Sequence, residues 1–158
     1  MSKPLRFFIA GIIQGSLPDT CHPQDYRVEI GNLLKKAFPG SEVFDPVEEY
    51  PDSISYDDAK ASAAFFDLMD RAGNHDVLVA FIPEASMGTA IELWNAHHAG
   101  SLVVSVSGLT RNWVVRYCSD LVLEDIAALE RLIADGSLAA AIEAKLGERR
   151  ISAPVEEE

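Results

Sequence analysis

The sequence predicts an open α/β fold in which five parallel strands form one sheet with helices on both faces. The first observation is that short apolar runs alternate with longer segments of helical periodicity along the chain. The second is the run Asp-Val-Leu-Val-Ala-Phe-Ile at residues 76–82, whose continuous apolar character is typical of a central strand buried on both faces. Such alternation builds βαβ units with right-handed crossovers, and we therefore expect the strand order 2-1-3-4-5.

Strands are expected where a short apolar run is bounded by residues that break regular structure. The first is dense in Phe and Ile and ends in glycine, and the second stops at Asp45-Pro46. The five expected strands are residues 5–11, 42–44, 76–82, 102–106 and 121–123.

Helices are expected where apolar residues recur at helical spacing. The first of these segments is closed by Pro39-Gly40, and the third ends at Gly100. The five expected helices are residues 24–38, 56–72, 87–99, 112–118 and 126–146. Gly136 is a candidate break in the last helix, and residues 48–55 have no periodicity and predict a loop.

Length and charge limit the function. A chain of 158 residues corresponds to about one domain, which we place at residues 1–147, followed by an acidic tail at 148–158 that we expect to be disordered. The net charge of −12 argues against a nucleic acid polymer and an anionic membrane surface as partners. No apolar run is long enough for a membrane span or a secretory leader, so we expect a cytoplasmic protein.

The side chains that could hold a metal or a cofactor are scattered. The two cysteines, Cys21 and Cys118, are far apart and fit free thiols in a reducing compartment. No two of the four histidines have the i,i+4 spacing of a helical zinc site. The loop after the first strand lacks both the dinucleotide glycine pattern and the phosphate-loop lysine. We therefore expect neither a metal nor a cofactor.

In the flavodoxin-like, Rossmann-like order 2-1-3-4-5, ligands bind at the carboxyl ends of the strands, between strands 1 and 3. The turn after the third strand there contains Ser86 as a candidate helix N-cap and Gly88, where backbone and ligand could approach closely. Glu92 follows on the same helix, and its neighbours one turn away are nearly all small. It either faces a hollow or lies as an ordinary glutamate at the helix edge.

A second acid would be needed for general acid catalysis alongside Glu92. Asp67 and Asp70 lie on the helix before the third strand, whereas Asp76 lies at the amino end of that strand, the wrong end of the sheet. Asp67 could equally be a solvated helix charge.

Taken together, these segments resemble the nucleoside 2-deoxyribosyltransferase family, which includes the related 2′-deoxynucleoside 5′-monophosphate N-glycosidases. The resemblance covers roughly residues 5–125. It rests on four stretches in the family's order: Phe8-Ile9-Ala10-Gly11, Asp67-Leu68, Asp76-Val77-Leu78-Val79-Ala80, and Ser86-x-Gly88-Thr89-x-x-Glu92-Leu93.

The resemblance implies that Glu92 is the nucleophile attacking the anomeric carbon of a (deoxy)ribosyl group and that Asp67 assists protonation of the leaving base, with Asp70 as the fallback. It also implies a homodimer or higher homo-oligomer, because Asn112 matches an Asn that reaches a neighbouring subunit's site. The substrate-binding residues it implies are Gly11, Ile13, Gln14, Gly15, Ser86, Gly88, Thr89 and Asn112.

This chain departs from one or the other branch of the family at three positions. The transferases usually carry Asp where this chain has Ser86, while the monophosphate enzymes carry Ser there. The monophosphate enzymes carry Arg in place of Gln14 and Ser in place of Ile12. The expected reaction is therefore N-glycosidic cleavage of a nucleoside or nucleoside monophosphate, followed by transfer or hydrolysis. Two alternatives remain: a nucleotide-binding sensor on the same fold, and a flavin redox protein.

Overall fold

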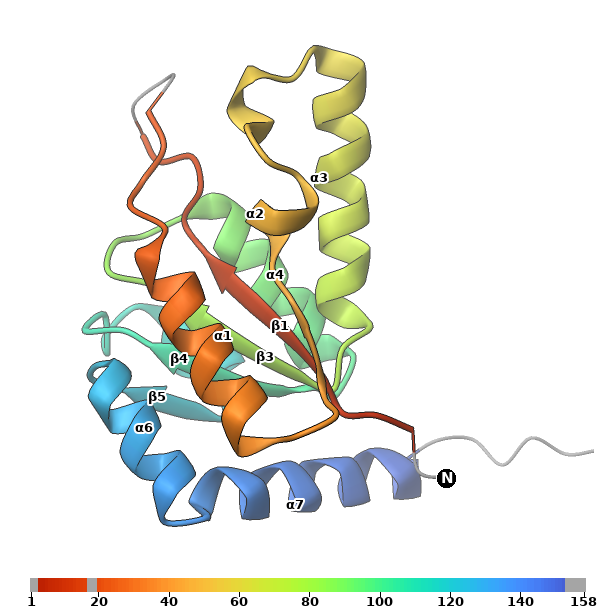
Figure 1. Ribbon diagram of the computed structural model, residues 1–158, viewed down its shortest axis with the longest axis vertical. Helices are drawn as coiled ribbons and strands as arrows, with labels where there is room; N and C mark the ends of the chain where they lie inside the picture. The colour runs from red at the N-terminus through yellow and green to blue at the C-terminus, as the bar shows by residue number, and fades with distance from the viewer. Residues whose placement is uncertain (1–2, 17–19, 153–158) are drawn as a thin grey trace, which may run out of the picture.

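The computed structural model describes residues 3–16 and 20–152, and in these ranges the chain forms a five-stranded parallel sheet (Figure 1). The strand order is β2-β1-β3-β4-β5, which confirms the predicted order 2-1-3-4-5. The strands are β1 (Arg6–Gly11), β2 (Glu42–Phe44), β3 (Val77–Phe81), β4 (Leu102–Val106) and β5 (Leu121–Leu123).

Helices cover both faces of this sheet, as the sequence predicts. The helices are α1 (Asp25–Ala37), α2 (Pro46–Glu49), α3 (Asp58–Gly73), α4 (Met87–His98), α5 (Trp113–Cys118), α6 (Ile126–Ala134) and α7 (Ser137–Ser152), with a 3-10 turn η1 (Ser53–Ser55). None of the described helices is long and apolar enough to cross a membrane.

Two stretches differ from the expectation. The segment expected as a loop at 48–55 overlaps α2 and contains η1, because Asp45 caps α2 by accepting a hydrogen bond from the Val47 N–H and Pro46 occupies the first turn. The expected helix at 126–146 is two helices, divided at the predicted break Gly136, whose positive φ of 81° only glycine adopts readily. α7 then continues to Ser152, past the boundary expected at 147, and the rest of the tail lies outside the described residues.

Alternate side chains of the central strands point to opposite faces and build two cores. On one face, Phe8, Leu78 and Val103 pack with buried residues of α3, α4 and α5. On the other, Phe7 and Val79 pack with α1, α6 and α7. Both faces of the central strands are therefore covered, which is why these strands are apolar along their whole length.

The helices extend unequally beyond the sheet. The N-terminal half of α3 projects past the carboxyl ends of the strands, next to η1, and the loop that leaves β1 extends in the same direction (Figure 1). α3 packs against α4, so this projecting half stands beside the turn that joins β3 to α4. These segments enclose a cleft.

Candidate active site

A cleft of about 670 Å³ opens at the carboxyl ends of β1 and β3, where the sheet order reverses. Its walls come from four segments: the end of β1 with the loop at 11–16, η1, the N-terminal half of α3, and the turn that begins α4. The size and position match an ordinary small-molecule site.

The start of α4 sets the position of Glu92. Ser86 caps the helix by accepting a hydrogen bond from the Thr89 N–H at 3.3 Å, and the Thr89 hydroxyl donates to the same oxygen at 3.1 Å. Gly88 also lines the cleft, and a side chain added there would meet no atom within 4 Å. Glu92 follows one turn later on the same face, so its carboxyl group reaches the cleft wall.

Glu92 is buried without a partner. It is 6% exposed, and no described residue gives it a hydrogen bond or an ion pair. Burial raises the pKa of this carboxyl group from 4.5 to about 8, against the smaller opposing effect of the Arg27 guanidinium. A buried unpaired carboxyl group that lines a cleft is unfavourable for folding and is typical of a functional group.

Arg27 is buried, and each nitrogen of its guanidinium has a partner other than Glu92. Its guanidinium donates to the carbonyl oxygens of Ile9 at 2.9 Å and Gly11 at 3.0 Å, and it forms an ion pair with Asp45 at 3.2 Å. Its Nε donates to the Gln24 side-chain oxygen at 2.6 Å. Arg27 therefore holds the end of β1 and influences Glu92 only through its charge.

Two glycines, one at the end of β1 and one in the loop that follows, allow close packing of side chains from outside the cleft. A Cβ at Gly11 would overlap the Tyr26 hydroxyl, and a Cβ at Gly15 would overlap Nε2 of His22. Both glycines line the cleft. A side chain at Gly11 would displace the buried Tyr26 ring, and one at Gly15 would displace the half-buried His22 ring.

Asp67 does not line the cleft, although the sequence predicts it as the acid. Its carboxylate accepts hydrogen bonds from the Tyr50 hydroxyl at 2.7 Å and from Nε of Arg71 at 2.6 Å. Burial acts to raise the pKa of Asp67, but these two hydrogen bonds outweigh it and hold the pKa below its usual value. A carboxylate kept ionised in this way is poorly suited to donate a proton. The fallback, Asp70, is exposed and also lies outside the lining.

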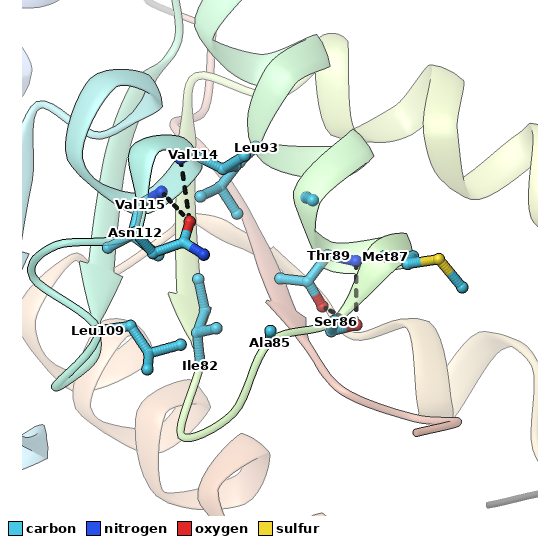
Figure 2. Close-up of a pocket in the computed structure, with 11 residues that line it drawn as sticks. Ile82, Ala85, Ser86, Met87, Thr89, Leu93, Leu109, Asn112, Val114 and Val115 are labelled. Carbon is cyan, nitrogen blue, oxygen red and sulfur yellow. Dashed lines mark hydrogen bonds between the residues drawn. The ribbon is translucent and has the colours of Figure 1, made fainter. Parts of the chain in front are cut away.

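Asn112 lies in a second, smaller pocket of about 230 Å³ on the other side of the β3–α4 turn (Figure 2). Its side-chain oxygen caps α5 by accepting from the N–H groups of Val114 and Val115. Ser86 and Thr89 line both pockets, but Asn112 does not line the cleft that contains Glu92. Within one chain, then, the structure does not bring Asn112 to Glu92.

The structure thus brings together eight of the ten predicted site residues on one cleft. They are Gly11, Ile13, Gln14, Gly15, Ser86, Gly88, Thr89 and Glu92. The apolar wall that α3 and η1 form was not predicted from the sequence. Its one signal was the mixture of small and large apolar residues along α3. That wall consists of Ile54, Ala61, Ala64, Phe65, Leu68 and Met69.

The cleft is poor in charge. Of the described residues that line it, only Glu92 titrates, and none is Lys, Arg or His. No group of three or more potential metal ligands occurs among the described residues. The two cysteines are free thiols, with Cys21 exposed and Cys118 buried.

Fold and site together define an open-sheet α/β protein with one buried carboxyl group in a cleft at the sheet's reversal point. Solved structures with this fold include a 2-deoxyribosyltransferase from the psychrotolerant bacterium Bacillus psychrosaccharolyticus. It matches with a TM-score of 0.61 at 19% identity, over 79% of this chain and 90% of that one. At the level of the fold, the chain is therefore like the nucleoside 2-deoxyribosyltransferases, as the sequence resemblance predicts.

A conserved protein from Enterococcus faecalis V583 shares the same fold. It matches with a TM-score of 0.61 at 15% identity, over 84% of this chain and 99% of that one. No protein-family model and no curated protein sequence matches the chain. The likeness to known proteins is thus one of fold.

Proposed function

We propose that the protein cleaves the N-glycosidic bond of a nucleoside, with Glu92 as the nucleophile. The observation that carries this proposal is the unpaired Glu92 carboxyl group, 6% exposed, on the wall of a 670 Å³ cleft. A nucleoside fits a cleft of this size. The fold shared with a 2-deoxyribosyltransferase supports the same class of reaction.

The reaction begins with the ionised Glu92. One carboxylate oxygen attacks C1′ of the sugar, the C1′–N bond breaks, and its electron pair leaves with the base through an oxocarbenium-like transition state. The departing base takes a proton from water at the open mouth of the cleft, since Glu92 alone titrates among the described lining residues. Attack on the glycosyl ester by water completes hydrolysis, and attack by a second base completes transfer.

The two walls of the cleft suit the two halves of a nucleoside. Gln14, Ser16 and Ser86 offer polar groups near the loop and the start of α4, where a sugar can form hydrogen bonds. Ile54 and Phe65 belong to the apolar wall, on which a planar base can pack. This arrangement directs C1′, which joins sugar and base, toward Glu92.

The charge of the cleft favours a substrate without a phosphate group. A phosphate dianion gains most from charged donors, yet no described lining residue is a cation and the chain carries a net charge of −12. Arg27 already has partners for its guanidinium nitrogens. We therefore expect nucleosides to be cleaved at least about tenfold faster than their 5′-monophosphates at low concentration.

Chromatography of free bases tests the proposed function. The protein is incubated with deoxyribo- and ribonucleosides and with their monophosphates, each with and without an added acceptor base. We expect base release from at least one nucleoside, and a new nucleoside in the presence of the acceptor if transfer occurs. Binding of nucleosides without any base release would instead identify a sensor and would refute the enzymatic proposal.

The pKa of Glu92 predicts how the rate depends on pH. Because only the ionised carboxylate attacks C1′ and burial raises its pKa to about 8, kcat/KM should rise roughly tenfold per pH unit below pH 8 and level off above it. The measurement is kcat/KM between pH 5.5 and pH 9.5. A flat profile across this range would contradict the assignment of Glu92 as the nucleophile.

We also propose that a second copy of the chain covers α4 and α5. Glu92, which is buried, is the one acidic residue between Ala85 and Cys118 in a chain of net charge −12. This stretch exposes large apolar side chains: Met87, Ile91, Trp94, Trp113, Val114 and Tyr117. An apolar surface almost free of acids is where two such anionic chains can meet without strong repulsion.

This second copy would bring its Asn112 to the Glu92 cleft, and mixing inactive variants tests the arrangement. Asn112→Asp keeps the oxygen that caps α5 but removes the amide donor, and it is mixed with Glu92→Gln. If sites are shared in a twofold dimer, an equal mixture should recover about a quarter of wild-type activity, because half of the dimers hold one intact site.

Mixing Glu92→Gln with Glu92→Ala provides the control and should recover nothing. Sedimentation of the same samples reports whether dimers form and exchange. Dimers that exchange without any recovery of activity would indicate that each site is complete within one chain.

A further inference from the structure

Gln24 stands outside the cleft, yet it joins both ends of the loop that forms one cleft wall. Its side-chain nitrogen donates to the carbonyl oxygen of Ile12 at 2.9 Å and to that of His22 at 2.6 Å. Its side-chain oxygen accepts from Nε of Arg27 at 2.6 Å. One amide thus connects the beginning of the loop, its end and a buried cation.

The position of Gln24 in the sequence gives no local reason for these contacts. It is the N-cap residue of α1, but its side chain caps none of the helix N–H groups. Glutamine is not among the residues preferred at that position. Its side chain is committed to tertiary hydrogen bonds, which stabilise the loop rather than the helix.

The loop that Gln24 closes carries Ile13, Gln14, Gly15 and Ser16, all of which line the cleft. Two further backbone contacts join its described residues: the His22 N–H donates to the Ile13 carbonyl at 3.1 Å, and Gln14 forms an isolated antiparallel bridge with Cys21. Losing the two hydrogen bonds from Gln24 would loosen the part of the cleft wall that residues 13–16 form.

We infer that Gln24 is a positioning residue, which holds the loop at 12–16 in the conformation that binds substrate. The effect of Gln24 on substrate binding rests on the proposed function. Its effect on the loop rests on the hydrogen bonds alone. The mechanism is preorganisation: a loop already held in its binding conformation loses less entropy when the ligand binds.

The variant Gln24→Glu removes the two hydrogen bonds that the Gln24 side-chain nitrogen donates. A glutamate keeps an oxygen for Arg27 but has no N–H group to give to Ile12 and His22. The control is Asp125→Ala, which removes a helix cap on α6 far from the cleft, where the Asp125 carboxylate accepts from the Ala128 N–H at 2.7 Å. Two readouts are compared for wild type and both variants: hydrogen exchange of the backbone amides, and kcat and KM for the nucleoside that is cleaved fastest.

In Gln24→Glu, we expect faster exchange confined to residues 11–24, a KM raised about tenfold and a kcat changed less than about threefold, as the loss of two hydrogen bonds would produce. Asp125→Ala should leave both the exchange of residues 11–24 and the KM as in wild type. Unchanged exchange of residues 11–24 in Gln24→Glu would overturn the inference. Faster exchange with an unchanged KM would overturn the claim that the loop held by Gln24 aids substrate binding.

The two proposals can fail separately. If the wild-type protein releases no base, the proposed function fails, while hydrogen exchange still decides whether Gln24 holds the loop. In that case the dissociation constant of a nucleoside is measured in place of KM. An equal dissociation constant in wild type and Gln24→Glu would overturn the claim that Gln24 aids substrate binding.

Discussion

Glu92→Gln is expected to reduce base release at least about a thousandfold, because an amide cannot form the glycosyl ester that the reaction requires. Glutamine has nearly the same shape, so the cleft and α4 should be preserved. The measurement is single-turnover base release by chromatography. More than a tenth of wild-type activity in this variant would contradict the role of Glu92.

The same substitution is expected to stabilise the fold. The pKa of Glu92 is about 8 in the folded protein against 4.5 as its ordinary value. The folded state therefore retains a proton that the unfolded state loses, and the wild-type protein loses stability as pH rises from 4.5 to 8. Glutamine has no such proton to lose, so at pH 8 the variant should be more stable by several kcal/mol, at about 1.4 kcal/mol per pKa unit.

Urea unfolding of both proteins at pH 4.5 and pH 8 checks this stability effect. The difference between variant and wild type should be small at pH 4.5 and large at pH 8. An equal difference at both pH values would show that the ionisation of Glu92 does not oppose folding. A loss of activity together with a gain of stability would mark Glu92 as a residue retained for function at a cost to the fold.

The second large effect is expected from Arg27→Met, which should lower the free energy of unfolding by about 3–5 kcal/mol. Arg27 is 2% exposed, and its removal leaves the partly buried Asp45 carboxylate without its ion-pair partner. The carbonyl oxygens of Ile9 and Gly11 also lose their donors at the end of β1. Urea unfolding at pH 7 measures the loss.

Two further variants test whether the burial of the ion pair causes the loss of stability in Arg27→Met. Adding Asp45→Asn to Arg27→Met removes the unpaired charge and should restore part of the lost stability. Arg131→Met breaks an exposed ion pair with Asp125, 4.0 Å apart, and should change stability by less than about 0.5 kcal/mol. A loss below about 1 kcal/mol for Arg27→Met would contradict the structural role given to Arg27.

Much of the sheet could be predicted because buried parallel strands have a distinctive local pattern. The runs at Glu42–Phe44, Leu102–Val106 and Leu121–Leu123 have the same bounds in the sequence prediction and in the structure. Each is an apolar run between residues that break regular structure. α2 was missed, because a helix of four residues has too few positions to show a period.

The site could be predicted in part. Glu92 was predicted at the cleft because a carboxyl group among small and apolar helix neighbours is unusual, and the loop after β1 because the strand order reverses there; both line the cleft. Asp67 was expected in the cleft, yet Tyr50 and Arg71 bind its carboxylate. These partners follow from how α3 packs near the segment after β2, which no local pattern reveals.

By itself, the sequence determined the parallel sheet, its order and the placement of Glu92 after the third strand, since hydrophobic periodicity and capping act over a few residues. Only the tertiary structure decided that α3 forms a wall of the cleft, that Asp67 lies outside it, and that Asn112 lies in a neighbouring pocket. It also decided that Gln24 and Arg27 hold the end of β1 and its loop. These contacts join residues far apart in the chain, so their geometry depends on packing.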